Sequence, residues 1–243
     1  MRHFEHFERS KESKTRGKRS AEASVLLFED KKSYAMALLL MLKKKYASQL
    51  KTSLSHSNPF ELLVATILSA QAQDAQVNKI TPKLFSKYKS ARDFAMAKPS
   101  ELYKYLKSIG LYRSKARRIV LASREIVKRF NGSVPASIEE LVTLHGVGRK
   151  TANVVLSNAF GINEGIAIDT HCITVSNRLG LAHSKDPIKI EKSLMKLFPR
   201  NEWGNVSHML IALGRDTCTA RAKHCERCVL KRICPSSTAN VKR

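Results

Sequence analysis

One lysine stands beside residues that could give it unusual chemistry. Residues 144–152 read LHGVGRKTA, and the apolar residues that follow recur at helical spacing. Two glycines allow a sharp turn, and a helix that begins there offers backbone N–H groups and the positive end of its dipole. Such a turn binds a phosphate without reading a base. The predicted phosphate-binding residues are Gly146, Val147, Gly148 and Arg149.

Lys150 lies on the side of this predicted helix that faces away from its apolar stripe. At about 100° per residue, Lys150 points nearly opposite that stripe. The first turn of a helix disfavours a cation, and Arg149 adds a like charge, so both effects favour the neutral, nucleophilic amine. From the residues alone, a nucleophile and a phosphate contact both remain open. The stripe consists of Ala152, Val155, Leu156, Ala159 and Phe160.

Four of the five cysteines lie close together near the C-terminus, with the spacing C-x6-C-x2-C-x5-C. Such clustering favours a metal or cluster site over a disulfide framework. Four thiolates can bind zinc or an iron–sulfur cluster, and the spacing alone leaves both open. The fifth, Cys172, is expected to be a small buried residue. The clustered residues are Cys218, Cys225, Cys228 and Cys234.

The chain is strongly basic, with a formal net charge of +24 over 243 residues. Residues 104–129 contain nine Lys or Arg against one acidic residue, and residues 221–243 contain seven against one. Proteins this basic usually bind a polyanion, most often nucleic acid, although an anionic membrane surface is an alternative. Two basic blocks that flank the lysine motif predict a continuous phosphate-binding surface.

The chain has no sequence signal for membrane insertion. No run approaches the roughly 18 apolar residues of a membrane span, and the first twenty residues lack the apolar centre of a signal peptide. Residues 1–30 are predicted to be a basic flexible tail. We expect an intracellular protein, cytoplasmic and nucleoid-associated in a prokaryote, or nuclear or mitochondrial in a eukaryote.

Strand signals are nearly absent, so the expected fold is all-α. Asn58 precedes Pro59 and Glu61, which is typical of a capped helix start, and Ser137 opens a capping box. Predicted helices cover residues 59–71, 100–108, 114–130 and 137–144.

Taken together, these motifs resemble the endonuclease III family of DNA glycosylases. The string at residues 144–155 is similar to the family's helix–hairpin–helix, and IDTH at residues 168–171 is similar to its aspartate-containing loop. The cysteine spacing is also the family's. The likeness runs from about residue 34 to residue 234. Two further stretches resemble the family's early helix and second turn: residues 58–72 and 109–116.

The resemblance implies a bifunctional DNA glycosylase and AP lyase of base excision repair, acting on oxidised pyrimidines of the thymine glycol type. A damaged nucleotide would leave the stack, and Lys150 would displace its base by attack at C1′. A Schiff base and β-elimination would then cut the strand 3′ to the lesion. Asp169 would be the essential carboxylate, stabilising positive charge on the sugar. Asp169 could also cap the helix beginning near Thr170, and the two roles are compatible.

Further roles follow from the same resemblance. Gln71 and Leu111 match residues that enter the duplex beside the flipped base, although Leu111 could also be a core residue. Arg221 and Lys223 would contact phosphate. The four clustered cysteines would bind a structural [4Fe–4S] cluster. The expected partner is double-stranded DNA that contains damaged bases or abasic sites, bound by a monomer without a membrane.

The implied architecture has two helical lobes. A six-helix unit would cover residues 53–163 and contain the helix–hairpin–helix at about residues 138–160. Residues 31–52 and 164–243 would form a discontinuous iron–sulfur cluster lobe. We expect a DNA-binding active-site cleft between the lobes, with the lysine and the aspartate on opposite sides.

Some positions depart from the family pattern, and two other functions compete. His145 stands where proline is usual, Thr174 where arginine is frequent, and the connection from Gly161 to Asp169 is one residue longer. A mismatch glycosylase for thymine, uracil or adenine is one alternative, but those relatives generally lack a lysine at position 150. A non-enzymatic helix–hairpin–helix protein is the other, and it needs neither Lys150 nor Asp169.

Overall fold

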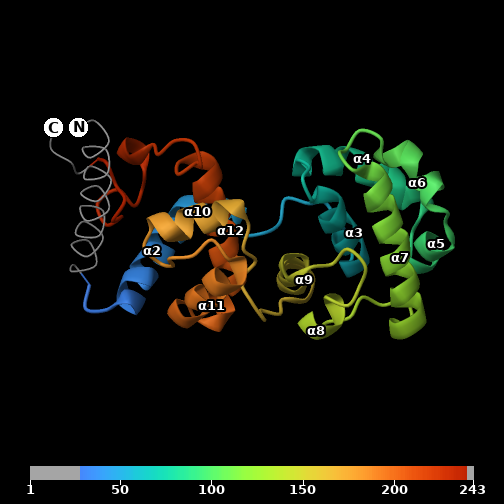
Figure 1. The fold of residues 1–243 in the computed structure, drawn as a ribbon, viewed down its shortest axis with the longest axis horizontal. Helices are drawn as coiled ribbons and strands as arrows, with labels where there is room; N and C mark the ends of the chain where they lie inside the picture. Colours follow the sequence, from blue (N-terminus) through green and yellow to red (C-terminus); the bar gives the residue numbers. More distant parts are fainter. Residues whose placement is uncertain (1–27, 240–243) are drawn as a thin grey trace, which may run out of the picture. The chain divides into compact units, whose positions relative to one another are not determined.

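The computed structural model describes residues 28–239, and every named element within that range is a helix (Figure 1). A single isolated β-bridge joins Cys218 to Lys223 there. The all-α prediction is therefore confirmed. Nearly all of the predicted tail at residues 1–30 lies outside the described residues. Within them, no helix has the length and apolar character needed to cross a membrane.

The chain forms two compact units. The hairpin unit is Lys51–Ala167, and the cysteine unit combines Met1–Leu50 with Ile168–Arg243. The sequence predicted a lobe at residues 53–163, with bounds a few residues away from these. Each unit has its own set of buried apolar side chains.

The hairpin unit is entirely described and contains seven α-helices and a π-helical turn. The unit therefore has seven α-helices where six were expected, and one of the seven, α8, is only a single turn. The helix predicted from residue 59 ends two residues early, where Gln71 takes a left-handed backbone with φ +54°. The elements are α3 (Pro59–Ser69), α4 (Asp74–Lys87), α5 (Ala91–Met96), α6 (Pro99–Leu106), α7 (Tyr112–Phe130), α8 (Ile138–Leu141), α9 (Arg149–Val155) and η2 (Leu156–Phe160).

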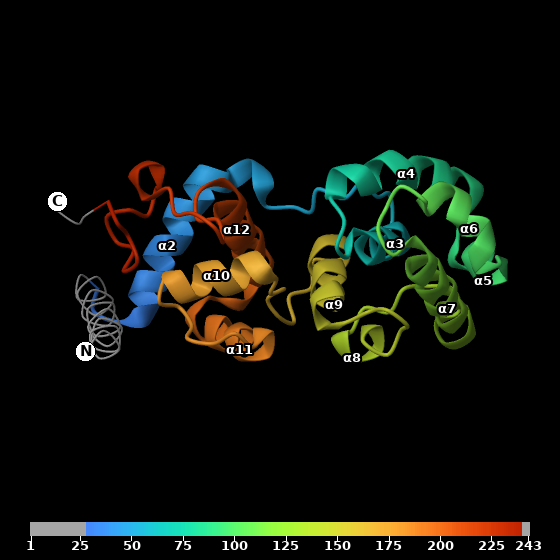
Figure 2. The ribbon, with the colours of Figure 1, turned by 45° about the horizontal axis from the view of Figure 1, so that its top comes forward.

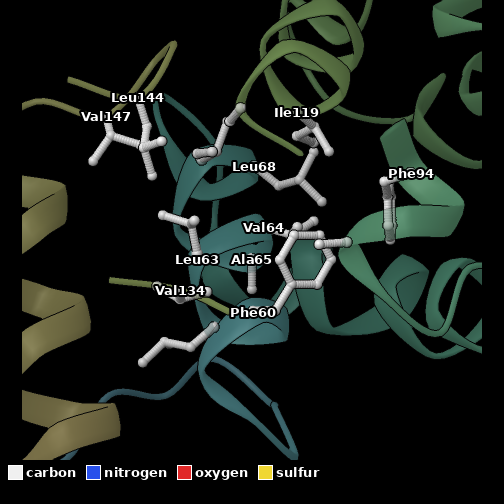
Figure 3. Close-up of a cluster of buried hydrophobic side chains, with 14 of the residues drawn as sticks. Phe60, Leu63, Val64, Ala65, Leu68, Phe94, Ile119, Val134, Leu144 and Val147 are labelled. Atoms are coloured by element: carbon white, nitrogen blue, oxygen red, sulfur yellow. The ribbon is translucent and has the colours of Figure 1, made fainter. Parts of the chain in front are cut away.

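Helix α3 is the centre of the hairpin unit. Asn58 caps it by accepting a hydrogen bond from the Glu61 N–H at 2.9 Å, as the sequence predicted. Its side chains are apolar nearly all round, which is typical of a buried helix, and it packs against α4, α7 and α9. Figure 3 shows that α3 shares its core with Leu144 and Val147 of the hairpin. The hairpin is thereby anchored to the most buried helix of the unit.

In the cysteine unit, α12 packs against both α10 and α2 (Figure 2). The contact with α10 is close at Gly214, because a Cβ there would lie 2.8 Å from the Cβ of His171. The buried Tyr34 hydroxyl of α2 donates to the Leu179 carbonyl at 3.0 Å. The described elements are α2 (Lys31–Tyr46), η1 (Ala47–Gln49), α10 (Thr170–Arg178), α11 (Pro187–Leu197), η3 (Arg200–Glu202), α12 (Trp203–Asp216) and η4 (Cys225–Arg227).

Candidate active site

The hairpin turn connects α8 to α9 and is held from below by two apolar side chains. Leu144 and Val147 are 3% and 5% exposed, and the Val147 N–H donates to the Leu144 carbonyl at 3.1 Å. Gly146 has φ +79°, and Gly148 is the N-cap of α9. Both glycines are exposed. The turn therefore presents the backbone around the two glycines, while Val147 serves as its anchor.

One face of α7 holds the hairpin from the side. The two oxygens of Glu125 accept hydrogen bonds from the His145 N–H at 2.8 Å and from its ring Nδ1 at 2.6 Å. One turn further along α7, the Arg129 guanidinium donates to the Thr143 hydroxyl at 2.8 Å. Two turns before Glu125, the stem of Arg118 lies against Gly146. Residues seven and four apart lie on one helix face, so α7 fixes the turn at three successive points.

Lys150 is exposed and lies in the first turn of α9. On the other side of the helix, Ala152, Val155 and Leu156 are fully buried. The last two residues of the predicted stripe lie in the π-helical turn, where they are partly buried against the same core. The predicted helical phase is therefore confirmed, and the lysine ammonium is on the side of α9 that a ligand can reach.

Gln71 and Leu111 share an uncommon backbone. Both are exposed and left-handed, with φ +54° and +58°, a conformation that few residues other than glycine adopt. Leu111 keeps 61% of its surface exposed, which rules out the core alternative for this side chain. A hydrogen bond from Gln76 Nε2 to Ser108 Oγ at 2.8 Å ties the start of α4, just after Gln71, to the turn before Leu111.

Asp169 is the N-cap of α10 in the cysteine unit. Its Oδ1 accepts from the Cys172 N–H at 2.8 Å, as the capping alternative predicted. The carboxylate is half-buried, so the helix fixes its position while a carboxylate retains capacity for further partners. Cys172 is fully buried, as expected.

The four clustered cysteines line one pocket of the cysteine unit. Burial, together with the nearby sulfurs of the other three, raises the pKa of Cys234 to about 11. Burial also raises the pKa of Cys228. The Arg178 guanidinium donates to Cys218 Sγ at 3.3 Å and to the Thr219 carbonyl at 2.7 Å, which fixes the start of the loop.

This donor set fits a cationic metal cluster. Metal coordination requires deprotonated thiols, and a cation among the four sulfurs would favour the thiolate forms of Cys228 and Cys234, which burial disfavours. Within residues 28–239, no three His, Cys, Asp or Glu side chains are arranged around a single ion position. The four cysteines line a common pocket, and four thiolates are ligands for zinc or for an iron–sulfur cluster.

The loop after the first clustered cysteine carries two exposed basic residues, Arg221 and Lys223. Lys223 Nζ donates to the Ser236 carbonyl at 3.0 Å, and the β-bridge from Lys223 to Cys218 closes the loop. The cysteine pocket therefore shapes a basic surface loop.

Comparison with known proteins identifies the family. The model of the HhH-GPD superfamily base excision DNA repair proteins matches residues 64–200. The chain belongs to this superfamily. Within it, the chain is a member of the endonuclease III family: it is 49% identical to endonuclease III of Synechocystis sp. over 210 residues, which cover 86% of this chain and 95% of that protein. It is also 49% identical to endonuclease III of Bacillus subtilis over 182 residues, covering 74% and 83%.

Two solved structures share the fold of this chain. A trapped endonuclease III–DNA covalent intermediate matches with a TM-score of 0.81 and 42% identity, covering 87% of this chain and 99% of that one. A thermostable thymine-DNA glycosylase matches with a TM-score of 0.74, but at 23% identity it supports the fold alone. The resemblance predicted from the motifs is confirmed.

Sequence reasoning missed the residues that hold the hairpin. Glu125 is the one acidic residue among nine basic ones at residues 104–129, and that isolation was the available signal. Lys115 of α7 was another omission, since its side chain is 2% exposed and Nζ has no hydrogen-bond partner within residues 28–239. The contact of Arg178 with Cys218 could not be predicted, because it depends on the fold that brings these two distant residues together.

Proposed function

We propose that this chain is a bifunctional DNA glycosylase and AP lyase that removes oxidised pyrimidines of the thymine glycol type. The observation that carries the proposal is the exposed Lys150 in the first turn of α9, directly after a hairpin shaped to meet a phosphate. A phosphate at this turn would bring the sugar of the same or a neighbouring nucleotide towards the ammonium. A DNA-binding protein without enzymatic activity would use a lysine there only as a phosphate contact, and strand cleavage distinguishes the two roles.

Lys150 supplies the nucleophile. Its neutral Nζ attacks C1′ of the damaged nucleotide, the bond from C1′ to the base breaks, and the base leaves with the electron pair and takes up a proton. Loss of the amine proton and ring opening of the sugar give a Schiff base. Removal of a C2′ proton then breaks the bond from C3′ to its oxygen, which leaves the phosphate on the 3′ side as a new end. Hydrolysis of the Schiff base frees Lys150.

Asp169 supplies the carboxylate. Capping of α10 through the Cys172 N–H holds Oδ1 in a fixed place, so that the negative charge is positioned before the substrate arrives. A preorganised carboxylate stabilises the positive charge that develops on the sugar as the base departs. It also accepts a proton as the lysine attacks.

DNA is bound by the hairpin and by the two left-handed turns. Gly146, Gly148 and Arg149 contact a phosphate, while Val147 contributes by fixing the turn from the core. Gln71 and Leu111 enter the duplex beside the flipped nucleotide. The exposed apolar side chain of Leu111, which lies on a strained turn, suits a wedge.

A [4Fe–4S] cluster is held by Cys218, Cys225, Cys228 and Cys234. Its role is structural: four thiolate bonds close the loop that carries Arg221 and Lys223, which contact phosphate from the cysteine unit. Arg178 assists by donating to Cys218 Sγ.

A panel of duplexes tests the proposal. One strand carries a single thymine glycol, a mismatched thymine, a uracil or an abasic site, and base release and strand cleavage are measured separately. The proposal predicts base release and cleavage for thymine glycol, and cleavage at the abasic site. Base release without cleavage, with a preference for the mismatch, would indicate a monofunctional mismatch glycosylase. Binding without either reaction would contradict an enzyme.

A further inference from the structure

The side chain of His145 in the hairpin is bound by a residue of α7 and is nevertheless exposed. His145 directly precedes Gly146, and 55% of its side chain is exposed. The same Glu125 carboxylate accepts from its backbone N–H at 2.8 Å and from its ring Nδ1 at 2.6 Å. A carboxylate that binds a residue at both points fixes the ring as well as the chain.

The second ring nitrogen is left for a ligand. Nδ1 is taken by Glu125, and within residues 28–239 Nε2 makes no hydrogen bond. A carboxylate beside one nitrogen orients the imidazole and makes Nδ1 the donor towards it. In the protonated ring Nε2 carries the other N–H, which is a charged donor of the kind that binds phosphate strongly.

We propose that His145, held by Glu125, is a further phosphate-binding residue of the hairpin. Its Nε2–H would reach the DNA backbone beside the contacts made by Gly146 and Gly148. Proline, which is usual at this position in the family, has neither a backbone N–H for Glu125 nor a ring donor. The proposal rests on the proposed function only in requiring that the hairpin binds DNA.

Three charged side chains of α7 lie around the hairpin turn that carries the ring. Glu125 binds the ring directly, the stem of Arg118 lies against Gly146, and Arg129 binds Thr143. Histidine is the side chain that ordinarily changes charge between about pH 5 and pH 8. A pH-dependent phosphate contact at the hairpin therefore reports His145. The remaining charged residues of the adjoining helices α8 and α9 are Glu139, Glu140, Arg149 and Lys150.

The test measures DNA affinity against salt concentration at about pH 6 and about pH 8. The ligand is a duplex with an uncleavable abasic analogue. Each phosphate contact contributes about 0.9 to the slope of log affinity against log salt concentration. At about pH 6 the wild-type protein should therefore lose about 3.5-fold more affinity than His145→Gln over a fourfold rise in salt concentration. At about pH 8 the difference should shrink.

Two variants separate a phosphate contact from a purely structural role. His145→Arg carries a permanent charge, so its slope should be steep at both pH values. His56→Gln changes a histidine elsewhere in the hairpin unit, where the ring bonds the Leu54 carbonyl, and should behave as wild type. Thermal unfolding of each variant shows whether the hairpin remains folded.

Equal slopes for wild type and His145→Gln at both pH values would overturn the inference. A loss of affinity in His145→Gln that is the same at every salt concentration would also overturn it, because that pattern would mean that the bonds between His145 and Glu125 only shape the turn. If the wild-type protein cleaves its substrate but its slope of log affinity against log salt concentration does not change with pH, this inference alone is overturned. A wild-type protein that does not bind the duplex overturns the proposed function as well.

Discussion

Gly146 and Gly148 lie two residues apart in the hairpin, and the structure gives them separate tasks. Gly146 has φ +79°, and a Cβ added to it would lie 2.9 Å from both Cβ and Cδ of Arg118. Gly148 has φ −93°, and a Cβ added to it would meet no atom within 4 Å. Gly146→Ala should therefore damage the fold, whereas Gly148→Ala should damage the binding of a phosphate in that open space.

The stability cost of Gly146→Ala has two parts. A left-handed backbone costs an alanine roughly 1–2 kcal/mol. Overpacking against the base of the Arg118 side chain adds about 1–3 kcal/mol, because Cβ cannot move without the helix. A total of about 2–5 kcal/mol lowers the unfolding midpoint by roughly 4–20 °C in a protein of this size. Gly148→Ala should cost only about 0.5–1 kcal/mol, since alanine is a poorer N-cap than glycine.

The affinity for DNA should change in the opposite order. A Cβ at Gly148 displaces a phosphate from the amide groups, and a hydrogen bond to a charged group contributes about 1.5–3 kcal/mol. Gly148→Ala should therefore weaken binding at least about tenfold at a temperature where it is fully folded. Thermal unfolding and fluorescence anisotropy with an abasic-analogue duplex measure the two quantities.

Similar behaviour of the two variants would contradict these separate roles of Gly146 and Gly148. Equal losses of stability would mean that the contact with Arg118 does not constrain the turn. A Gly148→Ala variant with wild-type affinity would mean that no phosphate lies at the start of α9.

Three further predictions follow from single side chains. Asp169→Asn retains an oxygen for the Cys172 N–H, so its free energy of unfolding should lie within about 0.5 kcal/mol of wild type while its activity is lost. Asp169→Ala should lose the activity and also about 1 kcal/mol of stability, because the helix cap is missing. Urea unfolding measures the stability, and base release measures the activity. Lys115→Met should stabilise the protein by about 1–3 kcal/mol near neutral pH, because it removes a buried amine without a hydrogen bond. Burial, and secondarily the charge of Arg118, lowers the pKa of Lys115 from its ordinary 10.5. Between the folded and the unfolded pKa the unfolded chain therefore binds more protons, and the stability of the wild-type protein should rise with pH through that window. The stability advantage of Lys115→Met, measured by unfolding at several pH values, should accordingly shrink towards about pH 10. Cys234→Ser should lose the visible absorbance of an iron–sulfur cluster, whereas Cys172→Ser, whose sulfur lies outside the cysteine pocket, should retain both that absorbance and its iron content.

Local signals in the sequence predicted the parts of the fold that depend on nearby residues. Asn58 and Asp169 cap their helices as expected, because a capping side chain bonds an N–H only three residues away. The phase of α9 was also predictable, since a stripe of apolar residues determines which side is buried. That phase by itself is sufficient to place Lys150 on the exposed side of the helix.

Contacts between distant residues were not predictable in the same way. The Leu111 side chain is apolar and fits both a core and a wedge, and its left-handed backbone and exposure depend on the turn between α6 and α7. Glu125 and His145 are twenty residues apart, so no local pattern joins them. The early end of α3 likewise follows from the left-handed Gln71, whose residue type gives no warning of it.

Covalent trapping tests the central claim, that Lys150 is the nucleophile. A duplex with one thymine glycol is incubated with the protein and sodium borohydride, which reduces a Schiff base to a stable bond between protein and DNA. The wild-type protein should give a trapped complex, and peptide mapping should locate the bond at Lys150. Lys150→Gln should give none, whereas Lys128→Gln, which removes an exposed lysine of α7 outside the hairpin, should trap as wild type does. A trapped complex that persists in Lys150→Gln, or one that maps to another amine, would contradict the account.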